Sequence, residues 1–154
     1  MGPLRPGQTW EDWLVGLAVT ARRALLARRD GARVVAGAYL LRSNTISPIL
    51  ETSLEILESA GFERVAALGA TMTLLRYATG IALDEQASPV GEMPGRLSAK
   101  QVLELHAPHV DAARWPRTAD AFQRAFTGTL RDREAVFRWG VTLIVRGLAS
   151  TVRA

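Results

Sequence analysis

A helical repeat of apolar residues near the C-terminus constrains the fold of this chain more than any other feature. From Glu134 to Leu148, apolar residues and glycines recur at steps of three and four residues. This spacing predicts an amphipathic helix with a broad apolar face. Gly140 and Gly147 lie seven residues apart on that face. Because glycine inside a helix costs up to about 1 kcal/mol relative to alanine, the pair indicates close approach of another helix, which a second copy of the chain could supply.

The composition is that of a globular protein. The chain has 154 residues, enough for one domain, and is 48% hydrophobic and 22% charged. It has no cysteine, which excludes disulfides and thiolate metal sites. It has no uninterrupted apolar run of about 18 residues, and its first residues lack the apolar core of a signal peptide. We therefore expect no membrane span and a soluble, cytoplasmic protein.

The positive charge is spread along the chain. The net charge is +4, and Lys100 is the one lysine among 19 basic residues. Only Arg22-Arg23 and Arg28-Arg29 are adjacent basic pairs. Binding to nucleic acid requires a clustered basic face that neutralises phosphates. We therefore expect an ordinary solvated surface, and no sequence-specific binding of a DNA duplex by this chain alone.

The chain shows helical patterns and almost no strand signal, so we expect an all-α fold. Thr9 is a predicted N-cap, Pro48 lies in a first helical turn, and Gly61 marks a helix end. Asp30 is a candidate cap for a short second helix. Residues 1–9 are expected to be an irregular lead-in and residues 10–154 one domain. The expected helices span residues 10–29, 31–38, 46–59, 63–83, 98–106, 118–126 and 131–152.

Candidate catalytic groups are few. His106 and His109 are the only histidines, and Pro108 between them disfavours the helical turn that would pair them on a metal. Asp84 and Glu85 are expected to follow the helix of residues 63–83, where they could hold a ligand or simply be solvated. The sequence contains no nucleophile elbow or glycine-rich phosphate loop. We expect no metal, no cofactor and no enzymatic activity.

Four segments in order resemble the C-terminal regulatory domain of transcription factors of the tetracycline-repressor type, the TetR family. They are Trp10-x-x-Trp13-Leu14 with Arg22 to Val34, Leu50 to Leu57 with Ala60-Gly61-Phe62, Thr79-Gly80-x-x-Leu83-Asp84-Glu85-Gln86, and Phe137-x-Trp139-Gly140-Val141 to Leu148. The resemblance implies a multi-helix domain that binds an effector and dimerises through a four-helix bundle. The family's N-terminal helix-turn-helix DNA reader has no counterpart here. This absence leaves two alternatives, a fragment and a regulator that naturally lacks the reader.

The resemblance also implies where an effector would bind. The family's tetracycline and magnesium contacts fall on Leu17, Ala21, Val35, Ala38 and Ser53, and only its acidic residue after the long helix has a counterpart, Asp84. Valine cannot ligate magnesium, so we expect an apolar pocket for a hydrophobic or aromatic effector. Arg76 could anchor an acidic or carbonyl group of that effector, and a dry core without a cavity is the alternative. The expected lining is Leu17, Ala21, Val35, Ala38, Ser53, Leu57, Thr71, Met72 and Arg76.

The glycine-containing helices are expected to form the dimer. The bundle would consist of residues 63–83 and 131–152 from each of two copies. Its predicted interface residues are Gly69, Gly80, Trp139, Gly140, Leu143, Ile144 and Gly147. The resemblance thus implies the effector-sensing and dimerisation domain of a transcriptional regulator. It implies negative regulation of transcription that a small hydrophobic ligand releases. DNA would be bound only through an N-terminal domain that is absent here. Alternatives are a partner without a DNA reader that titrates a full-length repressor and, less favoured, a small helical enzyme.

Overall fold

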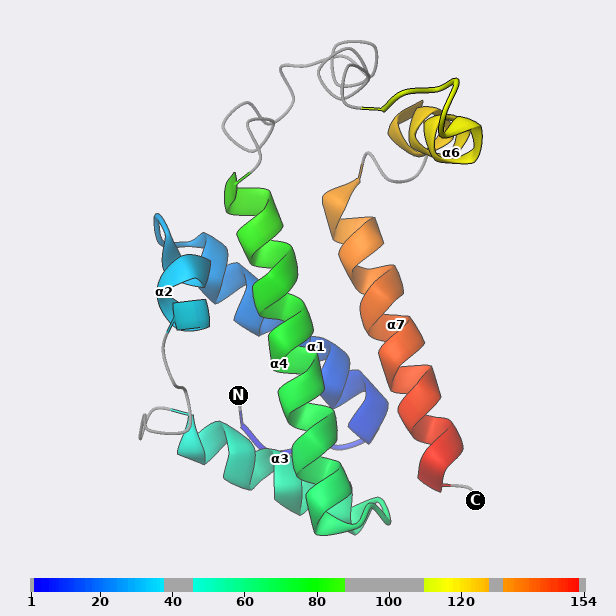
Figure 1. Ribbon diagram of the computed structural model, residues 1–154. Coiled ribbons are helices and arrows are strands. Elements are labelled where there is room, and N and C mark those ends of the chain that lie inside the picture. The colour runs from blue at the N-terminus through cyan, green and yellow to red at the C-terminus, as the bar shows by residue number, and fades with distance from the viewer. Residues whose placement is uncertain (1, 38–45, 88–109, 128–131, 153–154) are drawn as a thin grey trace. The chain divides into compact units, whose positions relative to one another are not determined.

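The structure is a computed structural model that describes residues 2–37, 46–87, 110–127 and 132–152 (Figure 1). Within these residues all regular structure is helical, which confirms the all-α prediction. The helices are α1 (Trp10–Leu26), α2 (Gly31–Gly37), α3 (Ser47–Ser59), α4 (Arg64–Ala87), α6 (Pro116–Thr127) and α7 (Arg133–Val152). Two compact units are formed, one by residues 1–86 and 138–154 and the other by residues 87–137. The expected helix at 98–106, both histidines and Ala38 lie outside the described residues.

Helix α1 begins at the predicted cap. The Thr9 hydroxyl accepts a hydrogen bond from the Asp12 amide at 3.1 Å, and the Asp12 carboxylate accepts one from the Thr9 amide at 3.4 Å. This reciprocal pair satisfies two amides that a helix start leaves unpaired. The indole of Trp13 donates to the Gly2 carbonyl at 2.8 Å. The lead-in is therefore fastened to the helix that follows it.

The turn between α3 and α4 confirms Gly61 as a helix end. Gly61 adopts φ +97°, and its amide donates to the Glu58 carbonyl at 3.0 Å. The Phe62 amide donates to the Leu57 carbonyl at 3.0 Å, which completes a Schellman motif. The Phe62 ring then packs edge-on against Trp10, with ring centroids 5.0 Å apart. This contact fixes the start of α1 against the α3–α4 turn.

Helix α4 is longer than predicted. It continues to Ala87, four residues beyond the expected end, so Asp84 and Glu85 lie inside the helix and do not follow it. No proline or glycine occurs between Gly80 and Ala87 to end the helix earlier. Figure 1 shows α4 crossing α1, with α3 at the N-terminal end of α4. Buried alanines at helical spacing, Ala67, Ala70, Ala78 and Ala82, allow neighbouring helices to lie close to α4.

The core of the first unit is built from four helices. Trp13, Leu14 and Leu17 of α1 are almost fully buried, together with Leu57, Leu74 and Val141 from α3, α4 and α7. Burial of each large apolar side chain contributes about 1.5–3 kcal/mol. The first unit therefore has a continuous apolar core to which α1, α3, α4 and the C-terminal part of α7 all contribute.

The second unit contains α6 and the first turn of α7. The Asp111 carboxylate accepts hydrogen bonds from the amides of Ala113 and Arg114, at 3.0 and 3.2 Å, before α6 begins at Pro116. The Asp132 carboxylate accepts hydrogen bonds from the amides of Glu134 and Ala135, in the first turn of α7, at 2.9 and 3.1 Å. Asp132 thus sets the start of α7 at Arg133, two residues later than predicted.

Candidate functional site

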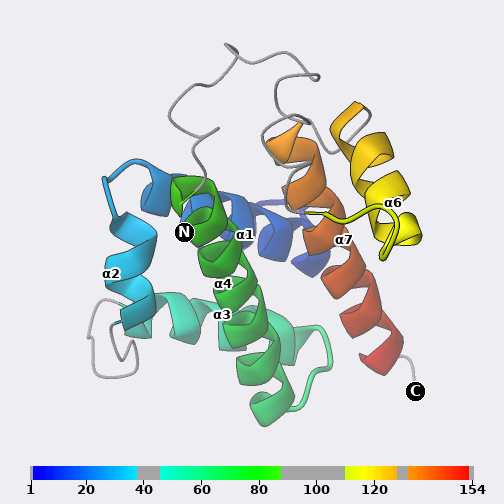
Figure 2. The same ribbon diagram turned by 45° about the horizontal axis from the view of Figure 1, so that its top comes forward.

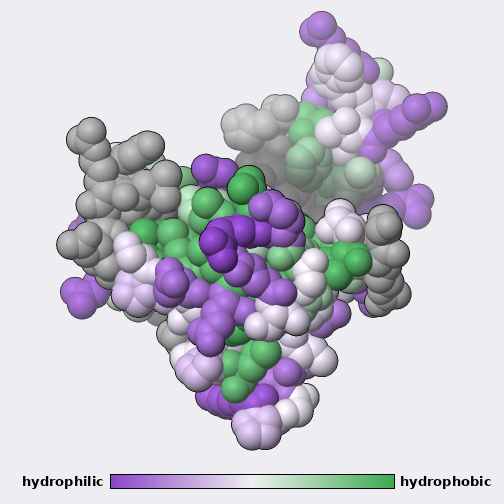
Figure 3. Space-filling model, turned by 90° about the horizontal axis from the view of Figure 1, so that it is seen from below, coloured by the Kyte–Doolittle hydropathy of each residue, from purple (hydrophilic) through white to green (hydrophobic). Residues whose placement is uncertain are grey.

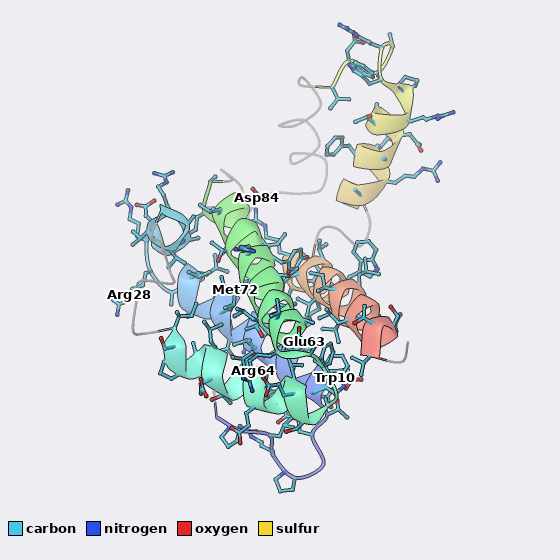
Figure 4. All side chains as sticks on the ribbon, turned by 60° about the horizontal axis from the view of Figure 1, so that its bottom comes forward. Trp10, Arg28, Glu63, Arg64, Met72 and Asp84 are labelled. Carbon is cyan, nitrogen blue, oxygen red and sulfur yellow. The ribbon has the colours of Figure 1, made fainter. Side chains whose placement is uncertain are left out.

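Five of the nine predicted pocket residues are buried in the core of the first unit. Leu17 is 2% exposed, and Ser53, Leu57 and Thr71 are 0% exposed. Met72 is also buried, and Figure 4 shows it midway along α4. These side chains come from α1, α3 and α4, as the resemblance implies. In this conformation they are sealed from solvent.

Two hydroxyl groups are the polar members of this buried set. The Thr71 hydroxyl donates its one hydrogen to the Ala67 carbonyl at 2.9 Å. The 2.8 Å contact between Ser53 and Thr71 therefore has Ser53 as its donor. Both hydroxyl hydrogens are thus used within the protein, and α3 is joined to α4 in the core. Only acceptor lone pairs remain on these oxygens.

The remaining predicted pocket residues are less enclosed. Ala21 and Val35 are half-buried, whereas Arg76 is exposed. At 3.6 residues per turn, Arg76 lies about 140° around α4 from Thr71. It shares an exposed stripe of α4 with Gly69, Thr73 and Gly80. The structure therefore separates Arg76 from the buried candidates.

The C-terminal end of α4 meets the corner between α1 and α2, defined here as residues 25–32 (Figure 2). The Gln86 amide nitrogen donates to the carbonyls of Leu25 and Arg28, at 3.1 and 2.9 Å. Its carbonyl oxygen accepts from the Ala32 amide at 3.1 Å. One side chain therefore satisfies backbone groups at the end of α1 and at the start of α2.

A bidentate ion pair lies beside the Gln86 contacts. The Arg22 guanidinium donates to the two Glu85 carboxylate oxygens at 2.8 and 2.9 Å. The two side chains are only 8% and 13% exposed. Glu85, considered from sequence as a ligand-holding group, is instead engaged with α1, while its neighbour Asp84 is exposed at the end of α4 (Figure 4).

The backbone of the corner has special requirements. Asp30 adopts φ +55°, and a Cβ atom on Gly31 would overlap the Leu25 carbonyl oxygen. This tight turn ends α1 at Leu26, three residues before the predicted end. Asp30 is a candidate cap of α2 from the sequence, whereas the hydrogen bond that the Gln86 carbonyl oxygen accepts from the Ala32 amide was not predicted. The available signal was that Arg22, Glu85 and Gln86 all lie within segments that resemble the family.

The predicted dimer residues occupy different environments. Trp139 and Leu143 are exposed on α7, at 65% and 48%, and Val65 is 73% exposed on α4. Gly69, Gly80 and Gly147 are exposed with open space where a Cβ would lie, and Ile144 is half-buried. On the face seen from below, Figure 3 shows hydrophobic residues, in green, mixed with hydrophilic ones, in purple. In this chain, a partner would therefore meet apolar and small residues on both helices.

Gly140 differs from the other glycines of the predicted interface because it meets α4 of the same chain. A Cβ at Gly140 would lie 2.6 Å from Cζ of Tyr77 and even closer to its hydroxyl oxygen. The close helix approach that this glycine predicts is therefore found within the chain. Burial raises the pKa of Tyr77, and the nearby charge of Arg22 opposes that rise.

The apolar character of α4 and α7 also bears on whether these helices could span a membrane. By length and composition, both helices are apolar enough to cross a membrane. Scattered polar residues divide the apolar stretch of each helix, so neither contains an uninterrupted apolar run of about 18 residues. Length and composition alone are weak evidence of a membrane span, since core helices of soluble proteins also meet this criterion. Among the described residues, no group of three or more potential metal ligands comes together.

Comparison with known proteins places these features in a family. Residues 2–152 match the family described as Tetracyclin repressor-like, C-terminal domain. The chain is 35% identical over 150 residues to the class A tetracycline repressor from transposon 1721 of Escherichia coli, and 32% identical over 147 residues to the class C repressor of Escherichia coli. Each match covers 94% of this chain and 60% of the relative. The chain thus spans about three fifths of the length of these curated relatives.

Solved structures show the same fold. A possible TetR family transcriptional regulator from Streptomyces coelicolor A3(2) superposes with a TM-score of 0.75 at 28% identity, covering 96% of this chain and 68% of that one. A single-residue variant of TetR from Acinetobacter baumannii AYE, in complex with minocycline, gives a TM-score of 0.63 at 22% identity, covering 97% of this chain and 62% of that one. The sequence match over nearly the whole chain and the shared all-helical fold lead to one conclusion: the chain belongs to the TetR family and corresponds to its C-terminal, ligand-binding domain.

Proposed function

We propose that this domain senses a small hydrophobic or aromatic effector, and that effector binding releases negative regulation of transcription. The observation that carries the proposal is the apolar, half-buried Val35, which stands where the family's magnesium-binding histidine falls. An aliphatic side chain offers no ligand to magnesium. The buried candidates Leu17 and Leu57 add apolar surface, and methionine at position 72 can adapt to ligand shape.

Access to the proposed site requires a conformational change. Leu17, Ser53, Leu57 and Thr71 are sealed in this conformation, so an effector must bind a more open one. An effector with higher affinity for the open state shifts the population toward it. In a dimeric regulator, that shift would alter the spacing of the two DNA readers, which is how effector binding would be coupled to transcription.

The effector proposal is tested by thermal unfolding with defined probes. We expect 1-naphthol or 1-aminoanthracene to raise Tm, because a ligand that binds only the folded state stabilises it by mass action. At one hundred times Kd the gain is about 2.7 kcal/mol, or roughly 5–10 °C for a domain of this size. Tetracycline with Mg²⁺ is expected to have little effect. A strong response to magnesium-tetracycline, without one to the apolar probes, would contradict the proposal.

The matched variants are Val35→Asp and Val34→Asp. Both place a carboxylate on α2, but Val34 is 69% exposed and lies outside the predicted lining. Val35→Asp should abolish the ligand-induced rise, and Val34→Asp should preserve it. Leu17→Arg would not serve as a pocket variant, because Leu17 is only 2% exposed and a charged side chain there would unfold the core.

We further propose that the domain forms a homodimer through α4 and α7. Trp139, Leu143 and Val65 are large apolar residues exposed on these two helices, and the neighbouring glycines permit close approach. A four-helix bundle that covers them would bury more than the roughly 1,000 Å² expected of a specific interface. It would also shelter the apolar surfaces that make both helices resemble membrane spans.

Sedimentation tests the dimer. The wild type should sediment at about twice the 16.7 kDa chain mass at micromolar concentration. Leu143→Glu should shift it to the monomer, whereas Val34→Glu, which adds the same charge on exposed α2, should not. Gly140→Trp is a poor test, because the new side chain would collide with Tyr77 of the same chain. A wild-type monomer would exclude the proposed interface.

The wider role follows from the family. The curated relatives are tetracycline repressors, so we propose a cytoplasmic regulator and not an enzyme. Specific binding to DNA would require a DNA reader outside this chain. Nanomolar, sequence-selective binding of a duplex by this chain at physiological salt, measured by mobility shift, would contradict this division of roles.

A further inference from the structure

We propose that Gln86 is a positioning residue that holds α2 in its closed place, and that α2 is the movable lid of the effector site. The inference rests on the proposed effector site for the role of the lid, but the contacts of Gln86 stand independently. Three hydrogen bonds from one side chain join the end of α4 to both sides of the α1–α2 corner. Gln86 is thereby attached to the end of one helix and to the start of the next.

Helix α2 has few other features that fix it. It is only seven residues long, and short helices are marginal without tertiary contacts. Ala32 is the one α2 residue that is fully buried, while Arg33, Val34, Ala36 and Gly37 are exposed. The Ala32 amide is also the α2 group that donates a hydrogen bond to the Gln86 carbonyl oxygen. The buried anchor of α2 and its polar attachment are therefore the same residue.

The Arg22–Glu85 ion pair explains why Gln86 is held in position. Its bidentate contact fixes the last turns of α4 against α1, directly before Gln86 in the chain. Because the ion pair already holds the end of α4 in place, the Gln86 side chain is positioned to reach the corner. Because α4 is also a helix of the proposed dimer, the same side chain connects the lid over the effector site to the helix that meets the partner.

Hydrogen exchange of the intact chain tests the positioning role without any ligand. Gln86→Ala should raise the exchange rates of the α2 amides from Ala32 to Gly37 by at least about fivefold, the factor expected from losing one net hydrogen bond. Amides of α3 should keep their rates. Asp84→Ala, two residues earlier on an exposed part of α4, is the control and should leave α2 unchanged. Unchanged α2 exchange in Gln86→Ala would overturn the proposal.

A ligand arm tests the lid. If α2 must open before binding, the apparent Kd is the intrinsic Kd divided by the open fraction. Gln86→Ala should then tighten binding of 1-aminoanthracene by a factor similar to the rise in α2 exchange. Weaker binding by Gln86→Ala would show that Gln86 shapes the bound state, and would overturn the lid. Faster α2 exchange with no ligand binding to either protein would support the positioning role and place the failure with the effector proposal.

Discussion

Replacing Gly140 by alanine should destabilise the domain, whereas the same change at Gly147 should stabilise it. Both glycines lie inside α7, so alanine gains about 1 kcal/mol of helix propensity at either position. At Gly147 the added methyl meets open space. At Gly140 it would overlap the Tyr77 ring, and such overpacking costs about 1–3 kcal/mol. The two variants should therefore differ by about 1–3 kcal/mol in the free energy of unfolding.

Urea unfolding followed by far-UV circular dichroism measures this difference. The slope with urea should stay constant, so that shifts in midpoint report stability. Measurements at two protein concentrations separate folding from association, because Gly147 belongs to the predicted dimer interface. In a Tyr77→Ala background, Gly140→Ala should become as favourable as Gly147→Ala, since the overlapping ring is gone. Equal stabilisation by both alanines in the wild-type background would show that Tyr77 moves aside freely and would refute the close approach.

Three further predictions concern polar groups. In urea unfolding, Thr71→Val should lower stability more than Ser53→Ala. The first variant leaves the buried Ser53 hydroxyl without its acceptor, which costs about 1–3 kcal/mol, whereas the second removes one hydrogen bond worth about 1 kcal/mol. The hydrogen bond from Arg64 lowers the pKa of Glu58 below its ordinary 4.5, so Arg64→Gln should raise that pKa in an NMR titration. In the wild type, the contribution of this contact to folding stability is present above pH 4.5 and is lost as pH falls. Burial raises the pKa of Tyr77 above its ordinary 10.0, so the contribution of its neutral side chain to stability is intact below pH 10 and is lost as pH rises. Tyr77→Phe has no ionisable hydroxyl, so its stability in urea unfolding should not show this loss across the same pH range.

Local signals predicted the fold well, and packing determined what they missed. Thr9 and Gly61 act through neighbouring backbone groups, so their roles could be read from the sequence. The face of α4 that points into the core could not be read in this way, because apolar residues occur around most of that helix. Arg76 was therefore predicted in the pocket, although it lies on the exposed stripe. Gln86 was missed because its partners are distant in sequence and are backbone groups, which leave no trace in residue type.

The α1–α2 corner also has a consequence for the order of folding. Arg22 and Glu85 are 63 residues apart, and Gln86 is 61 residues from Leu25. Closing so long a loop costs entropy before any contact compensates for it, whereas the α3–α4 turn forms from adjacent residues. We therefore expect the corner to form after the rate-limiting step of folding. Loss of the Gln86 side chain should then accelerate unfolding and leave the refolding rate nearly unchanged, so the corner would govern how long the folded domain persists.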